Sequence, residues 1–146
     1  MDYMREAVEY LKNYDKLNVA LNNLKDEIRE LKIDIKSVSG VEYSDLPKGA
    51  GINTDDRIIN LMFRLDKAQE EYKKTSRTLN RMNKVFDSFE KIDNNYAKIL
   101  KKYFIENLTE AQIADDLEIS YRHLRRLKQQ AIKAFSITIF GISAMS

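Results

Sequence analysis

The sequence predicts an all-α fold, namely a long antiparallel helical hairpin followed by a small C-terminal helix-turn-helix domain. Two observations predict it. The 146 residues include only four Gly and one Pro, a composition that favours long uninterrupted helices. Apolar residues also recur at spacings of four and three along the first part of the chain, as in helices that bury one face against a partner. We expect a hairpin at 1–93, with its loop at about 39–53, a helix-turn-helix domain at 94–135 and an apolar tail at 136–146.

The first predicted helix runs from Tyr3 to Val38. Its apolar stripe keeps the spacing without interruption and consists of Tyr3, Ala7, Tyr10, Tyr14, Leu17, Leu21, Leu24, Ile28, Leu31, Ile35 and Val38. A single narrow helix cannot bury such a stripe by itself, so it requires a partner helix. The second helix of the hairpin provides one, and the length of the stripe also makes a homodimer plausible. We interpret the tyrosines of the stripe as core or dimer contacts.

A connection is expected after Ser39-Gly40, because Gly suits the left-handed residue that follows a helix end. Pro47 then prevents helix propagation, and Gly49 and Gly51 permit positive φ angles. These residues predict the loop that turns the chain back on itself.

The second long helix is expected to begin at Asn53 or Thr54, since either side chain can cap it. Its apolar stripe continues to Phe89 and is weaker than the first. The segment Asp93-Asn94-Asn95 should break or bend this helix, because Asp and Asn favour caps and turns.

Short helices are predicted beyond this point. Thr109 and Gln112 have the spacing of a capping box, which indicates a helix at about 110–117. Ser120 can cap a further helix at about 121–135. Two such helices require a small residue where they touch, which Ala114 supplies. They also require apolar residues that point into a shared core, and these are Ile113, Leu117, Ile119, Leu124 and Leu127.

Two residues near these helices stand at positions with special backbone requirements. Asn107 is expected to take the left-handed conformation at a helix end. Glu118 occupies a turn position where helix-turn-helix pairs often have Gly, so we expect it to adopt an unusual φ angle or the turn to differ.

The charges of the chain are unevenly distributed. The formal net charge is only +2, which by itself says little about partners. Residues 109–119 carry four acids and no base, whereas residues 120–135 carry five bases and no acid. A helix that lies in a groove lined by phosphates requires such a concentration of positive charge.

The helix at about 121–135 is therefore predicted to bind the major groove of double-stranded DNA. Arg can pair with guanine through two hydrogen bonds and Gln with adenine, whereas lysines are expected to contact phosphates, as we predict for Lys128 and Lys133. The candidate DNA-binding residues are Ser120, Tyr121, Arg122, Arg125, Arg126, Lys128, Gln129 and Lys133.

The segment from Ile99 to Leu127 resembles the fourth-region domain of bacterial sigma factors. It resembles more closely the corresponding domain of small phage and prophage proteins, including the ArpU- and RinA-type late-gene regulators. The opening Tyr10-Leu-Lys-Asn-Tyr14 and the loop Ser44-Asp-Leu-Pro-Lys-Gly49 are similar to one uncharacterised group of such proteins. This resemblance implies promoter-proximal DNA binding and transcription control in a phage or prophage, with RNA polymerase as a further candidate partner. The family has Gly where Asn107 and Glu118 stand.

Other classes of function find little support in the sequence. The chain has no Cys and a single His, which excludes disulfides, thiolate chemistry and Cys-based zinc sites. We expect no enzymatic activity, no metal site and no cofactor. No apolar run approaches the roughly 20 residues of a membrane span, and no secretory signal is visible, so we expect a cytoplasmic protein without membrane contact.

Two alternatives remain open at this point. One is a small terminase-like DNA-recognition subunit of a phage, which would also join a helix-turn-helix to an oligomerising coiled coil. The other is a coiled-coil interaction protein with no DNA role. The tail at 136–146 could cap the helix-turn-helix core, dock on the hairpin or contact another subunit, and the sequence does not choose among these.

Overall fold

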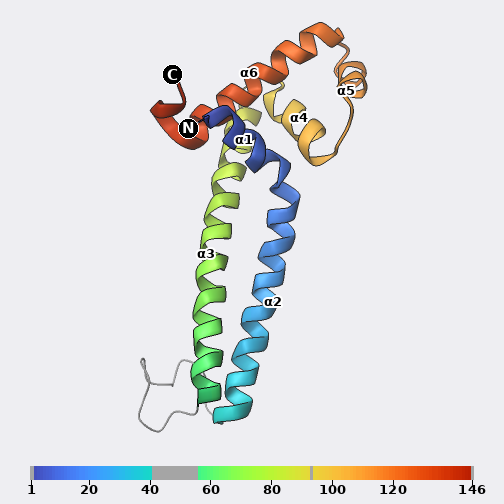
Figure 1. The fold of residues 1–146 in the computed structure, drawn as a ribbon. Coiled ribbons are helices and arrows are strands. Elements are labelled where there is room, and N and C mark those ends of the chain that lie inside the picture. Colours follow the sequence, from blue (N-terminus) through green and yellow to red (C-terminus); the bar gives the residue numbers. More distant parts are fainter. Residues whose placement is uncertain (1, 41–55, 93, 146) are drawn as a thin grey trace. The chain divides into compact units, whose positions relative to one another are not determined.

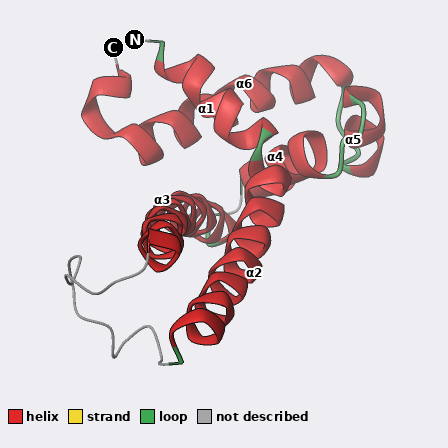
Figure 2. Ribbon diagram, turned by 60° about the horizontal axis from the view of Figure 1, so that its bottom comes forward, coloured by secondary structure: helices red, strands yellow, loops and turns green. Residues whose placement is uncertain are grey.

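The chain is all-α, as predicted. The structure, a computed structural model, describes residues 2–40, 56–92 and 94–145, and within these ranges nearly all residues are helical and none lies in a strand (Figures 1 and 2). No helix in these ranges combines the length and the apolar character needed to cross a membrane. The chain divides into two compact units, one of Asn18–Arg77 and one that combines Met1–Leu17 with Thr78–Ser146.

The first predicted helix is interrupted once. Helix α1 spans Tyr3–Lys12 and helix α2 spans Tyr14–Ser39. Between them, the side-chain amide of Asn13 donates a hydrogen bond of 2.8 Å to the carbonyl oxygen of Glu9. The prediction of one continuous helix is therefore wrong at Asn13, where a short polar side chain competes for a backbone carbonyl group.

The unit of Asn18–Arg77 is the antiparallel part of the hairpin. Helix α3 spans Asp56–Glu90, and within this unit it lies beside α2 and runs in the opposite direction (Figure 1). Their shared core consists of the buried residues Leu31, Ile35, Leu65 and Ala68, with Ile28, Leu61 and Met62 packed around them. Burial of this apolar face removes it from water, which stabilises the pair.

The connection between these helices is only partly described. The amide of Gly40 donates a 2.7 Å hydrogen bond to the carbonyl oxygen of Lys36, and the φ angle of Gly40 is +77°. The expected left-handed helix end is therefore present. The remainder of the predicted loop, and the caps predicted at Asn53 and Thr54, lie outside the described residues.

The second unit has a larger core, which joins both ends of the chain. Buried residues from α1, the last turns of α3 and the C-terminal helices form it: Ala7, Leu11, Met82, Val85, Phe86, Phe89, Ala97, Leu100, Ala131, Ile132 and Phe135. Tyr14 packs edge-on against Phe86, and Phe86 contacts Phe135, with ring centroids 5.7 and 5.9 Å apart. The tyrosines of the predicted stripe thus make contacts within one chain.

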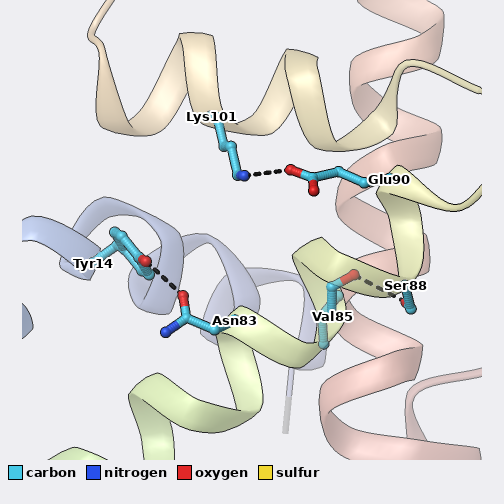
Figure 3. Close-up of polar contacts among 6 residues, drawn as sticks. All are labelled: Tyr14, Asn83, Val85, Ser88, Glu90 and Lys101. Carbon is cyan, nitrogen blue, oxygen red and sulfur yellow. Dashed lines mark hydrogen bonds and ion pairs between the residues drawn. The ribbon is translucent and has the colours of Figure 1, made fainter.

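Two polar contacts lie beside this core (Figure 3). The hydroxyl of Tyr14 donates a hydrogen bond to the side-chain oxygen of Asn83, and the ammonium group of Lys101 lies 2.6 Å from a carboxylate oxygen of Glu90. The first contact joins residues that are 69 positions apart in the sequence, and the second joins residues that are 11 positions apart. They place the end of α3 against α2 and against the segment that follows α3.

The break near residues 93–95 is present. Helix α3 ends at Glu90, Asn95 has a φ angle of 64°, and helix α4 spans Tyr96–Leu100. Asp93 lies outside the described residues. A π-helical segment, η2, spans Lys101–Ile105. Two residues after its end, Asn107 has a φ angle of 58°, which is the predicted left-handed conformation.

The predicted helix-turn-helix consists of α5, Glu110–Asp116, and α6, Tyr121–Phe140. Thr109 and Gln112 form the expected capping box, and the Ser120 hydroxyl accepts a hydrogen bond from the amide of His123. Glu118 has a φ angle of 55°, so the unusual conformation expected of it is present. The predicted core residues come together, with Ile99, Ile113, Ala114 and Leu124 buried and Tyr103, Leu108, Leu117, Ile119 and Leu127 packed around them.

The C-terminal segment is not a separate tail. Helix α6 continues past Phe135 to Phe140, and a short 3-10 helix, η3, spans Gly141–Met145. The Phe140 ring lies 5.3 Å from the Tyr3 ring and 5.7 Å from the Tyr10 ring, so α1 lies along this end of α6 (Figure 1). Of the three possibilities left open by the sequence, these contacts correspond to docking on the predicted hairpin, of which α1 is the first part.

These contacts change the predicted domain boundaries. The sequence placed a boundary at 93/94 and another at 135/136. In the structure Met1–Leu17 and the part of α3 from Thr78 onward belong to the same unit as the helix-turn-helix. The reason is packing, since the apolar residues at these ends of α1, α3 and α6 form one core.

Candidate nucleic-acid interface

Helix α6 presents two faces of different character. Its buried face carries Leu124, Ala131, Ile132 and Phe135, which lie on one side of the helix because they recur with helical spacing. The opposite face carries Arg122, Arg126, Gln129 and Lys133, spaced four, three and four residues apart and all exposed. We call these four residues the basic stripe.

The basic stripe retains its positive charge. Within the described residues, none of its three cationic side chains forms an ion pair with a carboxylate group. Two of the three acids of the neighbouring α5 are engaged elsewhere, because Asp116 lies 3.4 Å from the ammonium group of Lys102 and Glu110 contacts other cations of α6. An uncompensated row of cations on a helix is suited to bind a polyanion.

Arg126 has a neighbour that orders its side chain. Its terminal nitrogen Nη2 lies 2.7 Å from Nδ1 of His123, one helical turn earlier. A guanidinium group carries only donors, so Nδ1 is the accepting atom in this contact. The sequence indicated no role for His123 beyond that of a surface residue, and the structure makes it a support for Arg126.

Arg125 lies at the flank of the stripe nearest α5. Its side chain is 66% exposed, and its Nε atom lies 3.6 Å from a carboxylate oxygen of Glu110. Its guanidinium group also lies over the ring of Tyr121, 5.8 Å from the centroid. Tyr121 is the first residue of α6 and is itself half exposed.

Lys128 has a different environment from the other predicted DNA-binding residues. Its side chain is only 13% exposed. The ammonium group lies 3.4 Å from Glu110 and 4.0 Å from the centroid of the Tyr103 ring. The sequence grouped Lys128 with Lys133 as phosphate contacts, whereas the structure separates the two, with Lys128 turned into the domain and Lys133 exposed.

Two further features were missed by reasoning from the sequence. One is Glu110, which was assigned only to the acidic segment and which contacts two cations of α6. The other is an open cleft of about 620 Å³ beside the N-terminal end of α6, whose lining includes Lys12, Tyr103, Phe104 and Tyr121. The contacts of Glu110 depend on how α5 packs against α6, and the cleft depends on how α1, η2, α5 and α6 come together. No local pattern signals either packing.

The arrangement is suited to hold a polyanion along α6 and to present planar hydrogen-bonding groups to it. Ser120 caps the helix and Tyr121 and Arg122 begin it, so the polar side chains cluster at its start. The structure brings together all the predicted residues on α6 except Lys128, whose side chain faces inward. No protein-family model, curated protein or solved structure matches this chain.

Proposed function

We propose that this chain is a sequence-specific, double-stranded DNA-binding protein that regulates transcription, and that α6 binds the major groove. The observation that carries the proposal is the basic stripe, a row of exposed cations on a helix whose other face is buried. The major groove of DNA admits an α-helix. Cations placed along phosphates release condensed counterions, which favours binding.

The residues of α6 would make two kinds of contact with DNA, some with base edges and some with phosphates. Arg122, Arg125 and Arg126 can each pair with guanine, and Gln129 can pair with adenine. Ser120 and Tyr121, at the start of the helix, would approach the same groove. Lys133 lies further along the helix and would contact a phosphate, which positions the protein without reading the sequence. We leave Lys128 out of this surface because its ammonium group is held inside the domain.

A role in transcription is supported by the resemblance of Ile99–Leu127 to the fourth-region domain of sigma factors and of phage regulators. The features shared with that pattern lie in the helix-turn-helix itself. The capping box at Thr109 and the cap at Ser120 are local features that support the resemblance, and Asn107 and Glu118 have left-handed φ angles at the two positions where the family has Gly.

The experiment that tests the proposal is selection of bound duplexes from a random pool by the full chain. We expect one recurring motif and an affinity that falls as salt is raised, because phosphate contacts release counterions. Absence of salt-sensitive binding to duplex DNA would contradict the proposal. Measurement of the oligomeric state in parallel tests the homodimer. A large ring with a preference for packaging sites over promoters would favour a terminase-like subunit instead.

A further inference from the structure

The carboxylate of Glu110 joins the two helices of the helix-turn-helix. Its side chain is 20% exposed, and its oxygens lie 3.4 Å from the Lys128 ammonium group and 3.6 Å from Nε of Arg125. The oxygen that faces Arg125, Oε2, is shielded from solvent and accepts no hydrogen bond. A shielded carboxylate requires compensating charge, and here both compensating groups come from α6.

Each of the two cations also contacts an aromatic ring. The Lys128 ammonium group lies over the Tyr103 ring, and the Arg125 guanidinium group lies over the Tyr121 ring. Attraction between a cation and the face of a ring adds to the ion pair. Glu110 and Tyr103 therefore enclose the Lys128 ammonium group, and Glu110 and Tyr121 flank the more exposed Arg125 guanidinium group.

The consequences for the two cations differ. The Lys128 ammonium group lies inside the domain against Glu110, so it cannot contact a phosphate of DNA bound to the surface of α6. Arg125 is held only through Nε and remains largely exposed. Its two terminal amino groups stay available for the two acceptors of one guanine edge.

We infer that Glu110 is a specificity-determining residue of the proposed DNA surface. Its carboxylate keeps the Lys128 ammonium group away from phosphates and orients the Arg125 guanidinium group. This inference rests on the proposed function. Contacts to phosphates strengthen binding to every sequence, whereas contacts to base edges discriminate. The Glu110 carboxylate keeps one cation from contacting phosphates, which lowers affinity for every sequence. It also orients another cation toward the bases, which raises affinity for the target alone. The net result is that affinity for random DNA is lowered more than affinity for the target.

The first test compares Glu110→Gln with Asp115→Asn. Both variants remove one negative charge from α5, but Asp115 is exposed and forms no ion pair with α6 within the described residues. Affinity for the selected duplex and for random duplex is measured over a range of salt concentrations. Circular dichroism spectra and melting curves confirm that both variants are folded.

For Glu110→Gln we expect tighter binding to random duplex and a lower ratio of selected to random affinity. The slope of log affinity against log salt should steepen by about 0.9, the value for one added phosphate contact. Asp115→Asn should change both affinities alike and leave the ratio unchanged. If the two variants behave identically while the unmodified chain binds duplex with the expected salt dependence, the inference is wrong and the proposed function stands. If the unmodified chain shows no salt-sensitive duplex binding, both fail.

A second comparison does not depend on the fold of the Glu110 variant. Lys128→Met removes the withheld cation and keeps an apolar stem of similar length, and Lys133→Met does the same at an exposed position. We expect Lys128→Met to leave the salt slope for random duplex unchanged. Lys133→Met should make the slope shallower by about 0.9. A slope for Lys128→Met that is as shallow as the expected slope for Lys133→Met would show that Lys128 contacts phosphate directly, and would overturn the inference.

Discussion

Three non-glycine residues among those described have positive φ angles, Asn95, Asn107 and Glu118. Asn tolerates the left-handed conformation because its short polar side chain can bond locally, whereas a longer side chain is strained there. Glu118 is therefore the least suited of the three to its backbone. It is retained in the turn between α5 and α6, where its amide donates a hydrogen bond to the carbonyl oxygen of Asp115.

The strain at Glu118 gives a prediction about stability. Glu118→Gly should be more stable than Glu118→Ala by about 1 kcal/mol, because Gly lacks the Cβ atom that clashes in the left-handed region. The two variants remove the same charge, so their difference isolates the backbone term. Urea unfolding followed by circular dichroism measures it. Equal midpoints and slopes would show that Glu118 is not strained.

The exposed arginine on the flank of the stripe gives a prediction about recognition. Arg125→Ala should weaken binding to the selected duplex by about 1–3 kcal/mol and relax the preference at one base pair, the usual effect of losing a base-reading contact. Lys133→Ala should lower affinity evenly across sequences. Titration of a panel of single-base variants of the selected site distinguishes the two patterns. A uniform loss for Arg125→Ala would assign it to phosphate instead.

At the scale of single elements, α5 shows how a very short helix depends on its ends. It has seven residues, and a helix of this length is unstable alone. Its capping box satisfies two amides, with hydrogen bonds of 3.2 Å to the Thr109 hydroxyl and 2.9 Å to the Gln112 side chain. Its buried Ile113 and Ala114 then attach it to α4 and α6.

The capping box predicts that Thr109→Ala lowers the free energy of unfolding by about 1 kcal/mol. The reason is that the backbone amide of Gln112, in the first turn of α5, loses the hydroxyl oxygen that accepts its hydrogen bond. Thr138→Ala is the matched control. The Thr138 side chain is exposed and bonds back to the Ala134 carbonyl oxygen within α6, an interaction that adds little to helix stability. Thermal unfolding of both variants tests this, and an equal change in both would argue against the cap as the cause.

At the scale of the whole molecule, the division into two units differs from the division expected along the sequence. Helix α3 contributes to both units, with Leu65 buried in the unit of Asn18–Arg77 and Met82 buried in the core beside the helix-turn-helix. The proposed DNA surface on α6 therefore depends for support on residues that the sequence assigned to the hairpin.

This division predicts unequal effects of two similar substitutions on α3. Met82→Ala should reduce the protection of α6 amides against hydrogen exchange, since removal of a fully buried side chain costs about 2–5 kcal/mol in the core that holds α6. Leu65→Ala removes an equally buried side chain and should leave that protection largely unchanged. An equal loss in both variants would show that the two units unfold together.

The predictions that were confirmed share a physical cause. The capping box, the left-handed Asn107 and Glu118, and the buried and exposed faces of α6 all depend on residues within a few positions of one another. Backbone sterics, local hydrogen bonds and helical periodicity act at this range, so the sequence predicts them. The exposure of Arg122, Arg126, Gln129 and Lys133 on one face of α6 follows from the same helical periodicity.

What the sequence by itself determined is thus the all-α class, the positions of most helix ends and the composition of the basic stripe. Only the tertiary structure decided that Lys128 faces inward, that Glu110 contacts two cations of α6, and that the C-terminal segment packs on α1. Each of these depends on contacts between segments far apart along the chain. Such contacts are selected by the burial of apolar surface and by the compensation of buried charge, which no local spacing encodes.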